Sequence, residues 1–282
     1  MHLRSARVLL GLTVVSLLVS CASPSSRPDP ATAAALDRIL LSKHRPAANT
    51  ARDSYRHPKE TLVFFGIRSD MSVVEVWPGV GWYTEILAPL LHDKGQLYAA
   101  QLDPASGSYA RSVVDAYRQK LSERPDLYGK VAVTALGAPG ADGKLQPIAP
   151  PGSTDAVVTF RNLHNWMMAG WEQQALAAIR EALKPGGVLG IVEHRGDPRV
   201  PQDPKAASGY VNEQYAIEMI EKAGFKLVGR SEINANPRDT KNYDQGVWTL
   251  PPTYALGDKD RARYTAIGES DRFTLKFVKV ER

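Results

Sequence analysis

The sequence has little of several things that would narrow its class. A single cysteine among 282 residues excludes an intrachain disulfide framework. No charge of one sign dominates, because 35 Lys and Arg stand against 30 Asp and Glu, and the basic residues are scattered, so we expect no nucleic-acid partner. Internal repeats are also absent. The remaining composition, 43% hydrophobic and 23% charged, is that of an ordinary globular chain of one large or two modest domains.

Only one long apolar run is present, and it lies at the start of the chain. Arg4 and Arg7 precede an apolar stretch from Val8 to Val19. This stretch has the length of a signal core and is too short to span a bilayer comfortably. We therefore predict a signal peptide over residues 1–20.

The end of this run, Leu18-Val19-Ser20-Cys21-Ala22, resembles the lipobox of bacterial lipoproteins. The resemblance implies that Cys21 is lipidated and becomes the new N-terminus. Because Ala22 rather than Asp follows, it also implies an exported protein anchored to the outer membrane on its periplasmic side. Contact with the membrane is expected through this lipid anchor only. An ordinary signal with an incidental cysteine is the alternative.

The mature chain is expected to have three parts. Residues 21–30 join the lipidated cysteine to a Pro/Ser tether that cannot form a core. Residues 31–71 form an N-terminal helical segment, with helices expected over 31–43 and 57–65. Residues 72–282 form the main domain, in which 234–271 is a polar, loop-like insertion.

Strands and helices alternate in the main domain. We expect strands over 72–77, 95–102, 131–135, 155–160, 188–193, 225–233 and 272–280, and helices over 84–91, 109–121, 171–183 and 213–223. Such alternation implies crossover connections and a sheet covered on both faces. The last strand has no helix before it and can pair antiparallel. The predicted fold class is α/β, a three-layer sandwich with a mainly parallel, doubly wound seven-stranded sheet and an antiparallel last strand.

A glycine-rich turn follows the first expected strand. Gly79 and Gly81 come after the acidic Glu75, and they let the backbone pass close to a ligand and present N–H groups at a helix start. Asp103 ends the second strand, where a carboxylate can accept both hydroxyls of a ribose. In such sheets ligands lie beyond the carboxyl ends of the strands, so the pattern predicts a nucleoside site.

These residues, with Thr154-Asp-Ala-Val-Val158 and Leu183-Lys-Pro-Gly-Gly187, resemble the class I S-adenosylmethionine-dependent methyltransferases over roughly Ser72 to Val280. The chain is similar in particular to exported bacterial proteins known as predicted methyltransferases, through the runs 57–61, 77–85 and 267–271. The resemblance implies S-adenosylmethionine as cofactor and a small-molecule substrate. The residues assigned to the cofactor are Glu75, Trp77, Gly79, Gly81, Asp103, Arg161 and Asn162.

The sequence also departs from that family. Trp77 stands where the glycine loop usually has a Gly, and its ring could fill the space of the methionine moiety or pack beneath the loop. The adenine contact after the third strand has no clear counterpart, and Asp142 is the nearest candidate. A nicotinamide-binding Rossmann domain is the competing interpretation. Thr84, in the place of its third small residue, and the antiparallel finish argue against it.

Candidate catalytic residues follow the fourth and fifth strands. His164, His194 and Glu193 lie there, and an unperturbed histidine titrates near pH ~6.5, which suits proton removal from a substrate. Hydrogen bonding of loop backbone by both histidines is the alternative. Methyl transfer needs positioning, sometimes a base, and no metal. The three residues have no tight ligand spacing, so we expect no metal site.

Substrate contacts are expected from Asn165, Arg238 and Trp248. Arg238 could bind a carboxylate or phosphate through both arms of its guanidinium. Its alternative role is an ion pair within its own loop, to Asp239, Glu269 or Asp271.

The predicted export conflicts with the predicted cofactor, because S-adenosylmethionine is made inside the cell. Three interpretations follow: a methyltransferase that obtains the cofactor by another route, a protein that uses the same pocket for another ligand, and a non-catalytic lipoprotein that binds a ligand or a protein. The sequence specifies neither the substrate nor the oligomeric state.

Overall fold

The computed structural model describes residues 29–140, 143 and 145–281. The expected signal peptide over 1–20, the lipidation site Cys21, residues 22–28 of the tether and Asp142 lie outside the described residues. In the part of the chain that is described, no helix is both long and apolar enough to cross a membrane.

A single sheet forms the centre of the described chain. Its strands are β1 Ser72–Val76, β2 Gln96–Leu102, β3 Ala132–Leu136, β4 Thr154–Phe160, β5 Leu183–His194, β6 Phe225–Ser231 and β7 Arg272–Lys279. The order is β3-β2-β1-β4-β5-β7-β6, and all neighbours are parallel except β7, which is antiparallel to β5 and β6. The predicted fold class is confirmed.

Helices precede, separate and follow these strands. They are α1 Pro30–Leu40, α2 Ala47–Thr50, α3 Asp53–Arg56, α4 Pro58–Phe65, α5 Thr84–Leu91, α6 Ser108–Glu123, α7 Pro125–Tyr128, α8 Leu163–Ala169, α9 Glu172–Ala182, α10 Glu213–Lys222 and α11 Arg261–Ile267. Two short 3₁₀ turns are η1 Pro104–Ser106 and η2 Gly246–Thr249.

The position of each strand explains its sequence. β1 is central, and its apolar residues Val73, Val74 and Val76 are buried because helices cover both faces of the sheet. β6 lies at the edge, where buried and more exposed residues alternate. The chain runs outward from β1 to β3 and then returns to β4 on the other side of β1. The carboxyl ends of β1 and β4 therefore flank the point where the strand order reverses, which is where ligands bind in such sheets.

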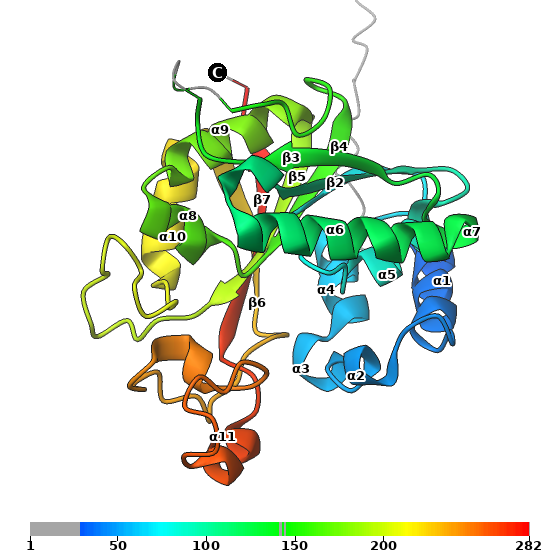
Figure 1. Ribbon diagram of the computed structural model, residues 1–282. Coiled ribbons are helices and arrows are strands. Elements are labelled where there is room, and N and C mark those ends of the chain that lie inside the picture. Colours follow the sequence, from blue (N-terminus) through cyan, green and yellow to red (C-terminus); the bar gives the residue numbers. More distant parts are fainter. Residues whose placement is uncertain (1–28, 141–142, 144, 282) are drawn as a thin grey trace, which may run out of the picture.

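Two apolar clusters form the layers on either side of the sheet. Helices α8, α9 and α10 bury Trp166, Leu176 and Ile220 on one face. On the other face, α1, α4 and α5 contribute Leu36, Phe65 and Leu87, among other buried side chains. Figure 1 shows these two groups of helices on opposite sides of the strands, the three layers that the sequence predicted.

Helix α4 packs unusually close to the sheet. A Cβ atom on Gly190 of β5 would lie 2.6 Å from the ring of Phe65. Only a residue without a side chain fits there, so this glycine sets how near α4 can approach β5.

Helix α5 has the predicted bounds of 84–91 although it contains Pro89. Pro89 has no N–H to donate to the carbonyl of Glu85, four residues earlier. His44 supplies the missing donor, because its Nε2 lies 2.8 Å from that carbonyl oxygen. The N-terminal segment thus satisfies a backbone group that the proline leaves unpaired.

Three local expectations need correction. Helix α8, Leu163–Ala169, was not predicted. Strand β5 begins at Leu183 rather than at 188, because Leu183 pairs with Thr154 and the next pair is Val188 with Ala156, so that residues 184–187 bulge out. The insertion over 234–271 contains η2 and α11 and is not loop throughout. In Figure 1 it lies beyond β6 and β7, at the end of the molecule that also holds α2 and α3.

Candidate functional site

The glycine turn between β1 and α5 is open on one side. Gly79 and Gly81 have φ values of +60° and +84°, in the left-handed region that favours glycine. A Cβ atom on Gly79 would meet nothing within 4 Å, whereas one on Gly81 would lie 3.1 Å from the ring of Tyr117. Gln101 donates a hydrogen bond to the Gly79 carbonyl at 2.7 Å and holds the turn in place. The backbone at Gly79 is therefore free to approach a ligand.

Trp77 has the backbone of a glycine and a side chain that packs into the core. Its φ is +48°, so the family's usual glycine matches the local conformation. The indole Nε1 donates to the carbonyl of Leu136 at 2.8 Å. The ring meets Trp166 and Trp171 edge-on, with centroids 6.0 and 5.7 Å away. These contacts match the second of the two placements considered, in which the ring is part of the packing.

Glu75 lies buried on the other side of the same turn. The Thr84 hydroxyl donates to its Oε2 at 2.6 Å, and the Tyr117 hydroxyl lies 3.1 Å from that of Thr84. Burial raises the pKa of Glu75 to about 7, against the effect of the Thr84 hydrogen bond and the charge of Lys120. Thr84, too large for a Rossmann glycine position, is thus the residue that fixes this carboxyl group.

Asp103 follows β2 and packs against the end of β3. Its Oδ1 accepts from the backbone N–H of Ala105 at 2.8 Å, which caps η1. A Cβ atom on Gly137, just after β3, would lie 2.9 Å from Oδ2. Oδ2 accepts no hydrogen bond from the described residues, and the side chain is half-buried. One carboxylate oxygen therefore remains for a ligand hydroxyl.

Glu193 and His164 form a buried pair at the ends of β5 and β4. The Nδ1 atom of His164 lies 3.0 Å from Oε1 of Glu193, and the His164 backbone N–H donates to Oε2 at 3.2 Å. An ionised Glu193 requires the proton on Nδ1, so Nε2 is left as an acceptor. This is the arrangement of a general base oriented by a carboxylate.

His194 stands next to this pair. Its Nδ1 lies 2.5 Å from the Ser270 hydroxyl, and its ring centroid lies 5.4 Å from that of His164. Burial holds the pKa of His194 well below its usual range, and the positive charges of Arg272 and Arg161 act in the same direction. His194 is therefore neutral at physiological pH.

The three predicted catalytic residues could also hold a metal ion, which their separation in sequence did not indicate. One ligand atom from each of His164, Glu193 and His194 lies within 4.8 Å of the others. The guanidinium groups that disfavour protonation of His194 would also repel a metal cation. The surrounding positive charge therefore disfavours a metal centre at this position.

A buried ion-pair cluster lies beside the histidines, and sequence reasoning missed it. Glu269 pairs with Arg52 at 2.5 Å, with Arg56 at 3.3 Å and with Arg272. Although burial acts to raise it, the pKa of Glu269 is held well below its usual range by these guanidinium groups. The only signal was that the runs 57–61 and 267–271 stood out as motifs, and both border this cluster.

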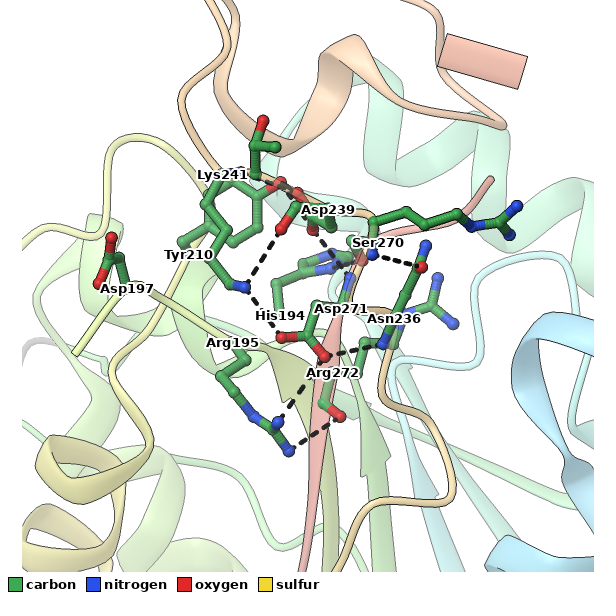
Figure 2. A network of polar contacts seen from close by, with 12 residues as sticks. His194, Arg195, Asp197, Tyr210, Asn236, Asp239, Lys241, Ser270, Asp271 and Arg272 are labelled. Carbon is green, nitrogen blue, oxygen red and sulfur yellow. Dashed lines mark hydrogen bonds and ion pairs between the residues drawn. The ribbon is translucent and has the colours of Figure 1, made fainter. Parts of the chain in front are cut away.

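Two further buried acids, Asp239 and Asp271, hold the insertion in place (Figure 2). Asp239 accepts from the Tyr210 hydroxyl at 3.0 Å and from the backbone N–H of Asp271 at 2.8 Å. Asp271 accepts from the backbone N–H of Asn236 at 2.9 Å and pairs with Lys241 at 3.0 Å. The carboxylates of Asp239 and Asp271 are therefore used in contacts that hold the insertion in place.

Arg238 is left outside these networks. The alternative partners considered for it, Asp239, Glu269 and Asp271, pair with other residues, and the guanidinium of Arg238 has no described ion pair. It is exposed and lines a pocket of about 290 Å³. The other lining residues are Ser54, Tyr55, His57, Asn234, Ala235, Asn236, Glu269 and Ser270.

The remaining predicted residues lie around the same strand ends. Trp248 meets the His164 ring edge-on at 5.9 Å. Asn162 donates to the carbonyl of Val76 at 2.9 Å and so ties the end of β4 to the end of β1. Asn165 lies in the first turn of α8 and donates to the carbonyl of Arg161 at 3.5 Å. The structure thus gathers the catalytic candidates and Trp248 at one place, with the glycine turn and Asp103 on the far side of β4.

Comparisons with known proteins agree with the architecture. No protein-family model and no curated protein sequence matches the chain. Among solved structures, a SAM-dependent methyltransferase from Aquifex aeolicus matches with a TM-score of 0.54 and 17% identity, over 90% of this chain and 100% of that one. The 4+2 cyclase SpnF matches with a TM-score of 0.57 and 16% identity, over 86% of each chain. The chain therefore has the class I methyltransferase fold, which similar proteins use for more than one reaction.

Proposed function

We propose that this protein is an S-adenosylmethionine-dependent methyltransferase acting on a small molecule. The observation that carries the proposal is the position of the glycine turn. It follows the central strand β1, with the free oxygen of Asp103 on one side and the Glu193–His164 pair on the other. A nucleoside cofactor and a proton acceptor would then lie on adjacent strand ends.

The residues present fit the cofactor. The open side of Gly79 lets a ligand lie against the turn. Asp103 offers Oδ2 to a ribose hydroxyl. When bound, S-adenosylmethionine supplies an activated methyl group on a sulfonium.

The chain's own residues would position and deprotonate the acceptor. Glu193 holds the His164 imidazole in one orientation, and Nε2 of that ring accepts the proton of the acceptor. Trp248 and His194 lie against the ring and reduce its contact with water. Positioning in a water-poor site is the main contribution a protein makes to such an in-line displacement.

Calorimetric binding of S-adenosylhomocysteine tests this function, with the full-length chain purified in detergent. We expect saturable binding that Asp103→Asn weakens by about 10-fold or more, because the amide nitrogen that replaces Oδ2 cannot accept a hydrogen bond from a ribose hydroxyl. Asp115→Asn, an exposed acid on α6, is the matched control and should leave the affinity unchanged. Absence of heat with millimolar ligand would sink the methyltransferase assignment.

We further propose that the chain belongs with the exported predicted methyltransferases and is anchored to the outer membrane, facing the periplasm, through a lipid on Cys21. The support is the lipobox-like run at 18–22 and the three shared motif runs at 57–61, 77–85 and 267–271. Arg56, just before the first run, lies over the Trp82 ring of the second, with 4.5 Å to the centroid, and pairs with Glu269 of the third.

A further inference from the structure

Positive charge exceeds negative charge where the N-terminal segment meets the start of β7. Arg52, Arg56 and Arg272 share the single carboxylate of Glu269. Arg161, at the end of β4, adds a further guanidinium close by. Burying unbalanced charge is costly unless another group supplies the opposite charge. The cluster therefore lacks an anionic partner.

Several donors in this cluster have no acceptor. Arg56 and Arg272 are only 4% and 2% exposed, yet Nη2 of the first and Nε of the second make no hydrogen bond in the described part of the chain. Arg161 makes neither a hydrogen bond nor an ion pair through its guanidinium to any described residue. Burial lowers its pKa to about 10, and the neighbouring charge of Arg272 adds to this effect.

The backbone of Arg161 is also unusual. Its φ is +64°, in the left-handed region that residues with a Cβ seldom adopt. Such conformations cluster at functional sites, where the surrounding structure enforces them. Here the Arg161 N–H donates to the carbonyl of Val192 at 2.7 Å, which continues the pairing of β4 with β5 and aims the side chain from the sheet end.

These arginines surround a cavity of about 10 Å³, room for the centre of one water-sized atom. Its lining residues are Arg56, Tyr83, Phe160, Arg161, Val192, Asn234 and Arg272. Asn234 also lines the 290 Å³ pocket that contains Arg238. Its Oδ1 is buried and unpaired, and can accept from a hydroxyl or a bound water. One oxygen of a ligand can thus enter the cavity while the rest of the molecule occupies the larger pocket.

We propose that the acceptor substrate is a small acid whose carboxylate or phosphate oxygen binds between Arg56, Arg161 and Arg272. The assignment rests on the methyltransferase function proposed above and deepens it. The cavity lies at the ends of β4, β5 and β7. Glu193 of the His164–Glu193 pair is on β5, His164 is on the helix α8 that follows β4, and Asp103 lies beyond β1. Arg161 then serves the acceptor and not the cofactor, to which the sequence assigned it.

Thermal unfolding of the full-length chain in detergent tests the anion site. Sodium acetate and sodium phosphate are titrated at constant ionic strength, maintained with sodium chloride. We expect a saturable rise in Tm of about 4 °C. Arg161→Gln should abolish this rise, while Arg118→Gln, an exposed arginine on α6, should retain it.

The same variant separates a binding role from a structural one. Without added anion, Arg161→Gln should melt at a higher temperature than the unsubstituted chain, because it removes an unpaired charge. An arginine that merely stabilised the fold would give the opposite result. A Tm that does not respond to either anion, or that rises equally in Arg161→Gln, overturns the proposal.

Nucleoside binding then distinguishes acceptor from cofactor. We expect Arg161→Gln to bind S-adenosylhomocysteine and methylthioadenosine, which lacks the carboxylate, as the unsubstituted chain does. Loss of affinity for S-adenosylhomocysteine alone would place the arginines on the cofactor's carboxylate and overturn the acceptor assignment. If the unsubstituted chain binds neither nucleoside, the methyltransferase function and the acceptor role both fail, and the melting experiment alone decides the anion site.

Discussion

At the scale of single residues, the contact between Glu193 and His164 carries the proposed chemistry. Replacing Glu193 by Gln removes the carboxylate that fixes the His164 ring, and replacing His164 by Asn removes the base. We expect each to lower transfer of a labelled methyl group into a bacterial envelope extract by about 100-fold or more. Affinity for S-adenosylhomocysteine should not change, because no contact joins either residue to the glycine turn in the described part of the chain.

His92→Gln is the matched control for that experiment, since His92 lies away from the strand ends and pairs with the exposed Asp93. It should leave methyl transfer unchanged. Full activity of Glu193→Gln and His164→Asn would show that both side chains only support backbone, the alternative considered for the two histidines.

Glu75 gives a prediction about pH. Its folded pKa of about 7 exceeds the value of 4.5 for a free carboxyl, so the folded state binds its proton more tightly than the unfolded state does. The resulting stability is present below about pH 4.5 and is lost as the pH rises through about 7. Glu75→Gln removes this loss. In urea unfolding we expect the variant to gain about 3 kcal/mol relative to the unsubstituted chain between about pH 4 and pH 8. If the free energies of unfolding of Glu75→Gln and the unsubstituted chain differed by the same amount at both pH values, the pKa of Glu75 would not be raised by burial.

Residue types at the strand ends were readable from the sequence, but their contacts were not. Glu75, the glycines and Asp103 fall where alternation of elements places the ends of β1 and β2. The partner of Glu75 is Thr84, the first residue of the next helix, and a short polar residue there also fits a surface position. Pairing of His164 with Glu193 spans 29 residues and has no local signature.

At the scale of elements, the approach of α4 to β5 depends on Gly190. A Cβ atom there would lie 2.6 Å from the Phe65 ring, so Gly190→Ala forces the helix away from the strand. We expect the free energy of unfolding to fall by about 1–3 kcal/mol, measured by urea denaturation. Combining it with Phe65→Leu should restore part of the loss, since the smaller side chain leaves room. Simple additivity of the two changes would mean that the ring is not the cause.

The predictable elements were those with a strong hydrophobic period or with helix-ending residues at their boundary. The bounds of α5 follow from its apolar face, and α9, predicted over 171–183, ends at Ala182, shortly before the Pro and Gly residues at 185–187. Helix α8 was missed because its seven residues are too few to show a period. The early start of β5 was missed because a bulge hides the pairing of Leu183 with Thr154.

At the scale of the whole molecule, the proposed anchor determines where the site lies. Cys21→Ser removes the only thiol in the chain and therefore the acceptor for the lipid. We expect complete loss of incorporated alkyne-labelled fatty acid and release of the chain from the outer-membrane fraction. Ser20→Ala, which keeps the cysteine, is the matched control. Fatty-acid label on Cys21→Ser, or an unsubstituted chain found in the cytosol, would contradict the proposed outer-membrane location.

The overall architecture was predictable because a buried parallel sheet imposes a repeating pattern along the sequence, from Val73 in β1 to Phe277 in β7. The arginine cluster was not predictable, because it joins segments more than two hundred residues apart, 217 between Arg52 and Glu269. For charged residues so far apart in sequence, no local pattern indicates which residue pairs with which. What the folded chain adds is the place where these segments meet.

The separation in sequence between these arginines and Glu269 affects the order in which the site forms during synthesis. Arg56 leaves the ribosome 213 residues before Glu269, and Arg52 even earlier. During synthesis both cations remain without their counterion Glu269 until most of the sheet has been translated. Arg272 follows three residues after Glu269. A nascent chain that stops short of Glu269 lacks β7, the strand that joins β6 to β5, and cannot complete the anion-binding centre. Maturation of the site is therefore a late step of biosynthesis.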